Sequence, residues 1–184
     1  MPELFLPRHG GYKKLLSYKK AEIIYDATVY FTSRFFRQGD RTIDQMVQAA
    51  RSGKQNIAEA SQASGTSKET ELKLTNVARA SQEELLIDYR DFLRKKEIAE
   101  WPKEHPFAVR LRELNTHPSP SYALFQKGIE HPDPAVCANV IIGLIKVTNF
   151  LLDRQIQYLQ KDFVKHGGIR ERMTQARLAY RKGN

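Results

Sequence analysis

Apolar and small residues recur at helical spacing over residues 45–92, in two runs separated by a short polar turn. The first run contains Met46, Ala50, Gly53, Ile57 and Ala60. The second run contains Leu74, Val77, Ala78, Ser81, Leu85 and Phe92. Each run places a narrow apolar stripe on one face of a helix, and no Gly or Pro interrupts the second run. The pattern predicts two helices joined by a tight turn and packed inside a helical bundle.

Residues 13–36 form a predicted first helix that carries two apolar stripes. The wide stripe contains Leu16, Ile23, Ile24, Ala27, Tyr30, Phe31 and Phe35. The second stripe contains Tyr18, Tyr25, Val29 and Phe36. One stripe suffices for the core of a monomeric bundle, so the second requires another surface to cover it. The simplest such surface is another subunit, and the alternative is the C-terminal segment folded back onto this helix.

The second and third helices are expected to start near Thr42 and at Thr66, which forms a capping-box pattern with Glu69. They end near residues 63 and 98. The third helix also carries a second stripe at Leu72, Leu86 and Leu93. The predicted subunit interface therefore consists of Tyr18, Tyr25, Val29, Phe36, Leu72, Leu86 and Leu93.

Prolines mark the boundaries of the elements in the rest of the chain. Residues 100–134 contain six prolines, and residues 100–133 are predicted to form a connector with short helices near residues 107–114 and 121–129. Asp133 and Pro134 then open a fourth helix that ends near Gly167. The predicted fold is an all-α, up-down four-helix bundle. It is organised as a tail (1–11), helices one to three (12–99), the connector (100–133) and a C-terminal region (134–184) that ends in a short basic helix.

The chain has a formal net charge of +9 and an isoelectric point of about 9.7, with two acid-poor basic clusters. Residues 4–21 contain five bases and no acid, and residues 161–184 contain seven bases against two acids. Tyr12, Tyr18 and Tyr180 interleave with these clusters and could stack on bases. Such clusters favour a nucleic acid as partner, and the alternative is a basic surface kept for solubility. The candidate nucleic-acid-binding residues are Lys13, Lys14, Lys19, Lys20, Arg37, Arg41, Arg51, Lys54, Arg170, Arg172, Arg177, Arg181 and Lys182. The first cluster also contains Arg8.

Candidate chemistry is sparse. Three of the five histidines directly precede proline in the connector, and none pairs with another histidine or a cysteine at helical spacing. The carboxylates of the third helix lack the Glu-x-x-His motifs of a di-metal bundle, and no phosphate-binding or nucleophile-elbow motif occurs. Cys137 lies on an apolar helix face, where a thiol behaves as a small hydrophobe. We therefore expect no enzymatic activity, no metal site and no cofactor.

The most apolar run, residues 138–152, is interrupted by Lys146 and Asn149. It is expected to be a core helix, too short and too polar to span a membrane. The single cysteine fits a reducing cytoplasm, and the N-terminal residues lack the basic-then-apolar order of a signal peptide. We therefore expect a cytoplasmic protein with no membrane partner.

Several short motifs of the predicted helical pair, and others in the C-terminal region, occur in a known family. The first group is Gln45, Ala49-Ala50, Asn56-Ile57-Ala58-Glu59, Ser67-Lys68-Glu69, Ala78-Arg79, Ser81 and Glu84-Leu85. The second includes Thr148-Asn149-Phe150-Leu151-Leu152 and Gly167-Gly168-Ile169-Arg170. The chain resembles the bacterial four-helix-bundle proteins that are encoded in intervening sequences of ribosomal RNA genes, in the subgroup with a C-terminal suffix region.

The same family includes the accessory protein of diversity-generating retroelements. The resemblance implies a homopentameric, basic barrel that binds a reverse transcriptase and nucleic acid. From the residues themselves, Asn56 and Glu59 are expected to be structural polar groups that reach Arg79 or Ser81. The predicted function is that of a non-enzymatic, oligomeric accessory protein that binds RNA or DNA. The alternative is an adaptor that holds a protein partner, such as a reverse transcriptase, without binding nucleic acid.

Overall fold

The computed structural model describes residues 10–182, which form helices and no strand. A 3-10 turn, η1 (Tyr12–Lys14), precedes α1 (Leu16–Phe35), α2 (Arg41–Ala63) and α3 (Lys68–Lys95). The connector contains α4 (Pro106–Asn115) and α5 (Tyr122–Ile129). The chain continues with the long helix α6 (Pro134–His166) and ends with α7 (Ile169–Lys182). The all-α prediction is therefore confirmed.

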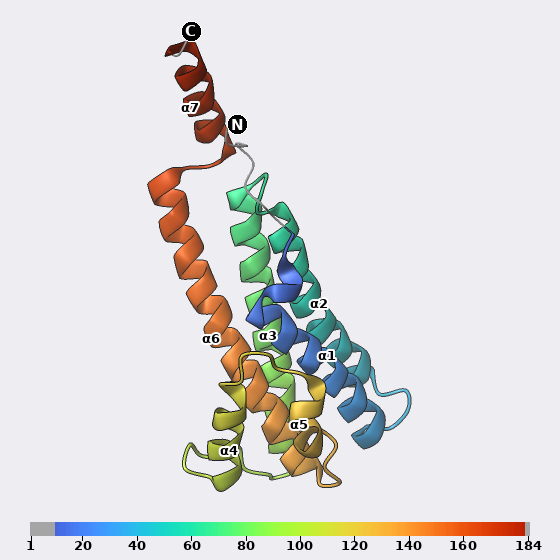
Figure 1. Cartoon of the computed structure of the whole chain (residues 1–184). Coiled ribbons are helices and arrows are strands. Elements are labelled where there is room, and N and C mark those ends of the chain that lie inside the picture. The colour runs from blue at the N-terminus through green and yellow to red at the C-terminus, as the bar shows by residue number, and fades with distance from the viewer. Residues whose placement is uncertain (1–9, 183–184) are drawn as a thin grey trace.

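Four helices form the body of the molecule. α1 packs on α2, α2 on α3, α3 on α6, and α6 on α1. The short helices α4 and α5 lie against one end of α6, whereas α7 projects past the opposite end of the molecule (Figure 1). The connector is therefore folded onto the body, and the C-terminal helix stands apart from it.

Local signals in the sequence fix most helix ends. The side chain of Asp133 accepts a hydrogen bond from Ala135 N at 2.8 Å, and Pro134 occupies the first turn of α6. Gly167 ends that helix with a φ of 67°, a conformation that favours glycine. At α3 the prediction is off by one residue, because Ser67 rather than Thr66 caps the helix, accepting from Thr70 N at 3.1 Å.

An aromatic cluster forms the centre of the core between α1 and α3. The ring of Phe31 lies 5.0 Å from that of Tyr89 and 4.8 Å from that of Phe92. The hydroxyl of Tyr89 donates to Thr28 Oγ1 at 3.1 Å, so the buried phenol keeps a polar partner. A smaller cluster takes one residue from each of α1, α2, α3 and α6: Ala21, Ile57, Ala78 and Leu152.

The face of α3 that is buried in the structure differs from the face that the sequence predicted. Leu86 and Leu93 are 4% and 2% exposed and lie in the core, whereas Val77 is 46% exposed. The reason is that α3 packs on both α2 and α6, so its buried arc is wider than a single-partner stripe. The prediction that Leu86 and Leu93 face another subunit is therefore wrong.

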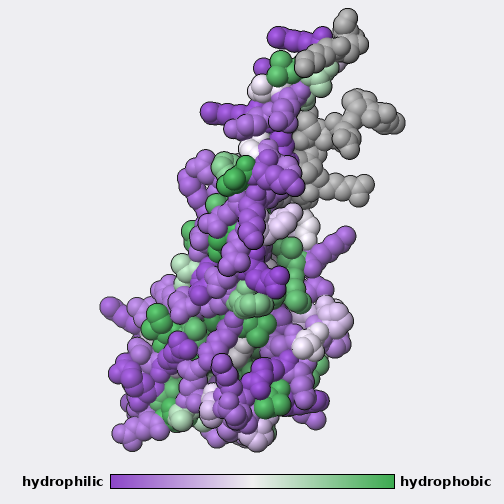
Figure 2. Space-filling view, turned by 90° about the vertical axis from the view of Figure 1, so that its left-hand side faces the viewer, coloured by the Kyte–Doolittle hydropathy of each residue, from purple (hydrophilic) through white to green (hydrophobic). Residues whose placement is uncertain are grey.

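The helical stretch Pro134–Arg181 contains an 18-residue window with a mean hydropathy of 1.9, which is long and apolar enough to cross a membrane. The expectation that this region is too short and too polar to span a membrane is therefore wrong as far as length and composition are concerned. Within the structure, 61% of that window is buried. On the α6 side of the molecule, apolar side chains are scattered among hydrophilic ones (Figure 2). This burial is typical of the core helix of a globular fold.

Candidate nucleic-acid interface

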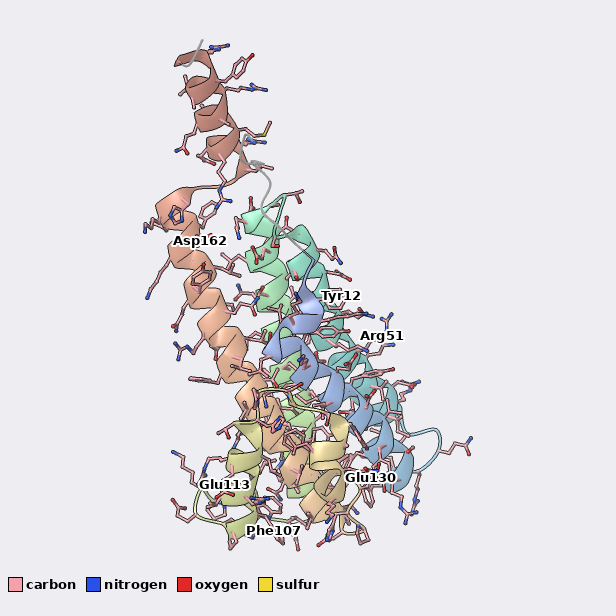
Figure 3. All side chains as sticks on the ribbon, in the orientation of Figure 1. Tyr12, Arg51, Phe107, Glu113, Glu130 and Asp162 are labelled. Atoms are coloured by element: carbon pink, nitrogen blue, oxygen red, sulfur yellow. The ribbon has the colours of Figure 1, made fainter. Side chains whose placement is uncertain are left out.

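Basic residues follow the α1–α2 pair along its length. Lys13 and Lys14 lie in η1, Lys19 near the start of α1, and Arg51 and Lys54 midway along α2. Tyr12 and Arg51 lie on the same side of the molecule (Figure 3). Arg37 and Arg41 flank the loop at the far end of α1, a 20-residue helix of about 30 Å. We call these seven bases the α1–α2 basic stripe: Lys13, Lys14, Lys19, Arg37, Arg41, Arg51 and Lys54.

The bases of the stripe lack close ion pairs in the described chain, although the charge of Lys54 acts on the nearby carboxyl of Asp26. Within residues 10–182, none of its seven bases forms a salt bridge. The side chain of Lys54 instead lies over the ring of Tyr25, at 4.2 Å from its centroid. Lys13, Lys14, Arg37, Arg41 and Arg51 are exposed.

Lys20 does not belong to this surface, contrary to the prediction. Its side chain is buried, and Nζ donates to Asn115 Oδ1 at 2.6 Å and to the Asn115 carbonyl at 3.4 Å. Asn115 is the last residue of α4, where the helix dipole favours a positive charge. Burial lowers the pKa of Lys20 to about 8. Lys20 therefore ties α1 to the connector and cannot reach a phosphate at the surface.

The helix α7 forms a second basic surface, which we call the C-terminal arm. Arg170, Arg177 and Arg181 are exposed and Arg172 is half-buried, and none of the four forms a salt bridge in the described chain. Lys182 ends the helix, but its side chain lies outside the described part, as does Arg8. Tyr180 is 73% exposed, so its ring is available for stacking.

The aromatic stripe of α1 is covered by the same chain. Tyr18 packs edge-on against Tyr12 of η1 at 4.7 Å, and Phe36 lies 5.6 Å from Phe92. Tyr25 lies under Lys54, as described above, and only Val29 of this stripe is classed as exposed, at 41%. Leu72 on α3 is half-buried. The argument that this stripe requires another subunit to cover it is therefore wrong, because η1, α2 and α3 supply the cover.

The polar contacts expected between Asn56 or Glu59 and Arg79 or Ser81 do not form in the described chain, and other pairs of residues are bonded instead. Asn56 Nδ2 donates to the Ser52 carbonyl at 2.9 Å, and the Ser52 hydroxyl lies 2.9 Å from that of Ser81. Arg79 does not turn towards α2. It donates to Glu83 at 2.7 Å and to Asp153 of α6 at 2.9 Å. Glu59 is exposed, so it contributes no contact between helices.

A buried polar residue that we did not predict lies at the α2–α3 contact. Gln82 is fully buried, and neither its Oε1 nor its Nε2 has a hydrogen-bond partner in the described chain. A Cβ atom at Gly53 would lie 2.3 Å from Gln82 Nε2. Gly53, in the middle of α2, is the sequence feature that could have indicated this contact, because a glycine within a helix allows a neighbouring side chain to approach closely.

The described residues do not bring together a reactive centre. No group of three or more His, Cys, Asp or Glu side chains within residues 10–182 could hold a metal ion. Burial raises the pKa of Cys137 to about 12, and its thiol donates to the Ile129 carbonyl at 2.7 Å. Burial and the nearby Glu84 and Asp91 raise the pKa of Asp88.

Known proteins provide no further guide to this surface. No family model, curated protein or solved structure matches the chain. The family resemblance of the helical motifs stays a prediction. The case for a function therefore depends on the charges, contacts and exposure described above.

Proposed function

We propose that this protein binds nucleic acid, RNA or DNA, without enzymatic activity, through the α1–α2 basic stripe and the C-terminal arm. One observation carries the proposal. The bases of these two surfaces lack ion-pair partners in the described chain, whereas several bases on the rest of the surface have them. Arg79, Arg90, Arg94, Arg110 and Lys146 are paired with carboxylates in this way. Unpaired cations raise the local potential and attract a polyanion.

Phosphate contacts dominate the proposed binding. Arginine and lysine neutralise phosphates and release condensed counterions, so affinity falls steeply with salt. Such contacts position a protein without reading sequence. We therefore propose weak sequence specificity, with Tyr180 adding stacking on unpaired bases.

The proposal includes the finer architecture. We propose that α1, α2, α3 and α6 act as an up-down four-helix bundle, and that subunits assemble into the homopentamer that the family resemblance implies. The residues that support a subunit contact are now the exposed apolar ones, Val29, Val77 and Ile87, which are 41%, 46% and 53% exposed. In an oligomer, copies of each basic surface would repeat, and their fields would add.

The test compares two sets of charge reversals. Arg51→Glu/Lys54→Glu/Arg177→Glu/Arg181→Glu removes four unpaired bases, and the control Arg90→Glu/Arg94→Glu/Arg110→Glu/Lys146→Glu removes four paired ones. Affinity for a duplex DNA and a structured RNA is measured from 50 to 200 mM salt. Each lost phosphate contact lowers the log–log slope by about one. The first variant should therefore lose about four units of slope, and the control none.

Two outcomes would contradict the proposal. Equal slopes for the two variants would mean that pairing does not select the binding surface. Absence of any binding by the unmodified protein would favour the adaptor alternative, for which the exposed Met173, Leu178 and Tyr180 of the arm provide an apolar surface.

A further inference from the structure

The connector forms a groove that the proposed function does not use. A hollow of about 670 Å³ lies between α4, α5 and the start of α6. Its wall is mostly apolar and includes Trp101, Leu111, Leu114, Leu124 and Phe125. The volume lies in the range of about 300 to 1,000 Å³ that is typical of small-molecule sites. We call this hollow the α4–α5 groove.

Two glycines explain why the groove has this form. A Cβ atom at Gly128 of α5 would lie 2.8 Å from Val140 Cγ2, and one at Gly143 of α6 would lie 2.3 Å from Leu111 Cδ2. Each short helix thus sits very close to α6 at one point. Leu111 and Val140 are buried at these contacts, and a hollow remains between the two helices.

The charged residues that line the groove are basic, although a neighbouring carboxylate, Glu113, pairs with one of them. Arg110, Lys127 and His131 line it, and no carboxylate does. Glu113 occupies one nitrogen of Arg110, at 2.9 Å, which leaves other donors of the guanidinium available. Behind the wall, the buried Nζ of Lys20 lies 5.7 Å from the centre of the Phe125 ring and forms no salt bridge in the described chain.

We propose that the α4–α5 groove binds an amphipathic anion, specifically a medium-chain carboxylate. Its hydrocarbon chain lies against Trp101, Leu114 and Phe125, and its carboxylate meets Arg110 and Lys127. An apolar wall supplies affinity and the cations supply specificity for the head group, because a neutral head group gains no charge-assisted hydrogen bond. Each added methylene that is buried strengthens binding about fourfold. The proposal is independent of nucleic-acid binding.

The experiment compares decanoate with decan-1-ol, which has the same chain length and no charge. Both are titrated below the concentrations at which they aggregate. Binding is followed by calorimetry and by the fluorescence of Trp101, the only tryptophan in the chain. We expect saturable binding of decanoate at least tenfold tighter than that of decan-1-ol. Binding of hexanoate should be weaker by more than tenfold.

Matched variants locate the site. Arg110→Gln/Lys127→Gln should weaken decanoate about tenfold and leave decan-1-ol unchanged. The control Lys103→Gln/Arg112→Gln changes two bases that line a different hollow, on the other side of α4, and should alter neither ligand. Leu124→Glu places a carboxylate in the wall and should abolish decanoate binding. Circular dichroism verifies that each variant keeps its helical content.

The proposal is overturned if decanoate does not saturate, if decan-1-ol binds equally tightly, or if Arg110→Gln/Lys127→Gln binds decanoate like the unmodified protein. Equal weakening by the control pair would also overturn it, because the binding would then follow total charge. Nucleic-acid affinity is measured on the same variants, so that failure of this site is distinguished from failure of the proposed function.

Discussion

The two sides of the molecule differ in how many of their bases are paired with acids. On the α3–α6 and connector side, several bases meet carboxylates: Arg79 bonds to Asp153, and both Arg90 and Lys146 bond to Glu100. On the α1–α2 stripe and the C-terminal arm, the described bases form no such pairs. Exposed pairs contribute little stability, but they cancel the local field. We therefore expect the partners of the charges, as well as the net charge, to decide which surface attracts a polyanion.

Lys19 and Lys20 are neighbours in α1 that belong to opposite sides of this comparison. Lys20→Glu should lower the free energy of unfolding by about 3 kcal/mol or more, because it places a carboxylate beside the Asn115 carbonyl in a buried site. Lys19→Glu should change it by less than about 0.5 kcal/mol. Urea denaturation of both variants measures the difference. Equal effects would mean that Lys20 is not buried in solution.

The pH dependence of stability provides a second test of the burial of Lys20. Burial lowers the pKa of Lys20 from 10.5 to about 8. Between these values the unfolded chain retains a proton that the folded chain has released, so this lysine makes the free energy of unfolding rise with pH. Lys20→Met lacks this contribution. Chemical denaturation from pH 7 to 10.5 should give a difference between the two proteins that increases through this window.

Subtracting the two curves is necessary because other groups titrate in the same range. Burial raises the pKa of Cys137 to about 12, which lowers stability as pH rises above the ordinary pKa of a thiol. That contribution is present in both proteins and cancels in the difference. A flat difference curve would contradict the assignment of the lowered pKa to Lys20.

The smallest expected effect concerns an ion pair on the paired side. A double-mutant cycle of Arg79→Ala and Asp153→Ala should give a coupling energy of about 0.2 to 1 kcal/mol. These two groups are 2.9 Å apart and partly exposed. On the unpaired side, Arg51→Ala should leave stability within about 0.5 kcal/mol of the unmodified protein. Thermal or urea unfolding measures both, and a larger loss at Arg51 would reveal a hidden partner.

Features that depend on neighbouring residues could be predicted from the sequence. The start of α6 at Asp133-Pro134 and its end at Gly167 follow from capping and from glycine conformation, which act within a few residues. The short connector helices were also expected within one residue of their bounds. Helix ends can therefore be predicted from nearby residues, without knowledge of the tertiary contacts of the helix.

Features that depend on distant residues could not be predicted. The partner of Lys20 is Asn115, 95 residues away, and nothing near Lys20 distinguishes it from Lys19. Leu86 was misplaced because a helix with two packing partners buries a wider arc than its pattern suggests. The candidate site follows the same rule. The sequence located the basic clusters, but their lack of ion pairs emerged only from the tertiary contacts.

The length of α6 sets the scale at which the two basic surfaces can cooperate. Its 33 residues span about 50 Å, and the loop between α1 and α2, which Arg37 and Arg41 flank, lies away from α7 (Figure 1). Two weak sites on one protein bind the same ligand jointly only if the ligand can span both, and the second contact then benefits from a high effective concentration. A duplex rises 3.4 Å per base pair, so about 15 base pairs are needed. We expect a duplex of at least this length to contact Arg37, Arg41 and the C-terminal arm together, and a shorter duplex to reach only part of the stripe.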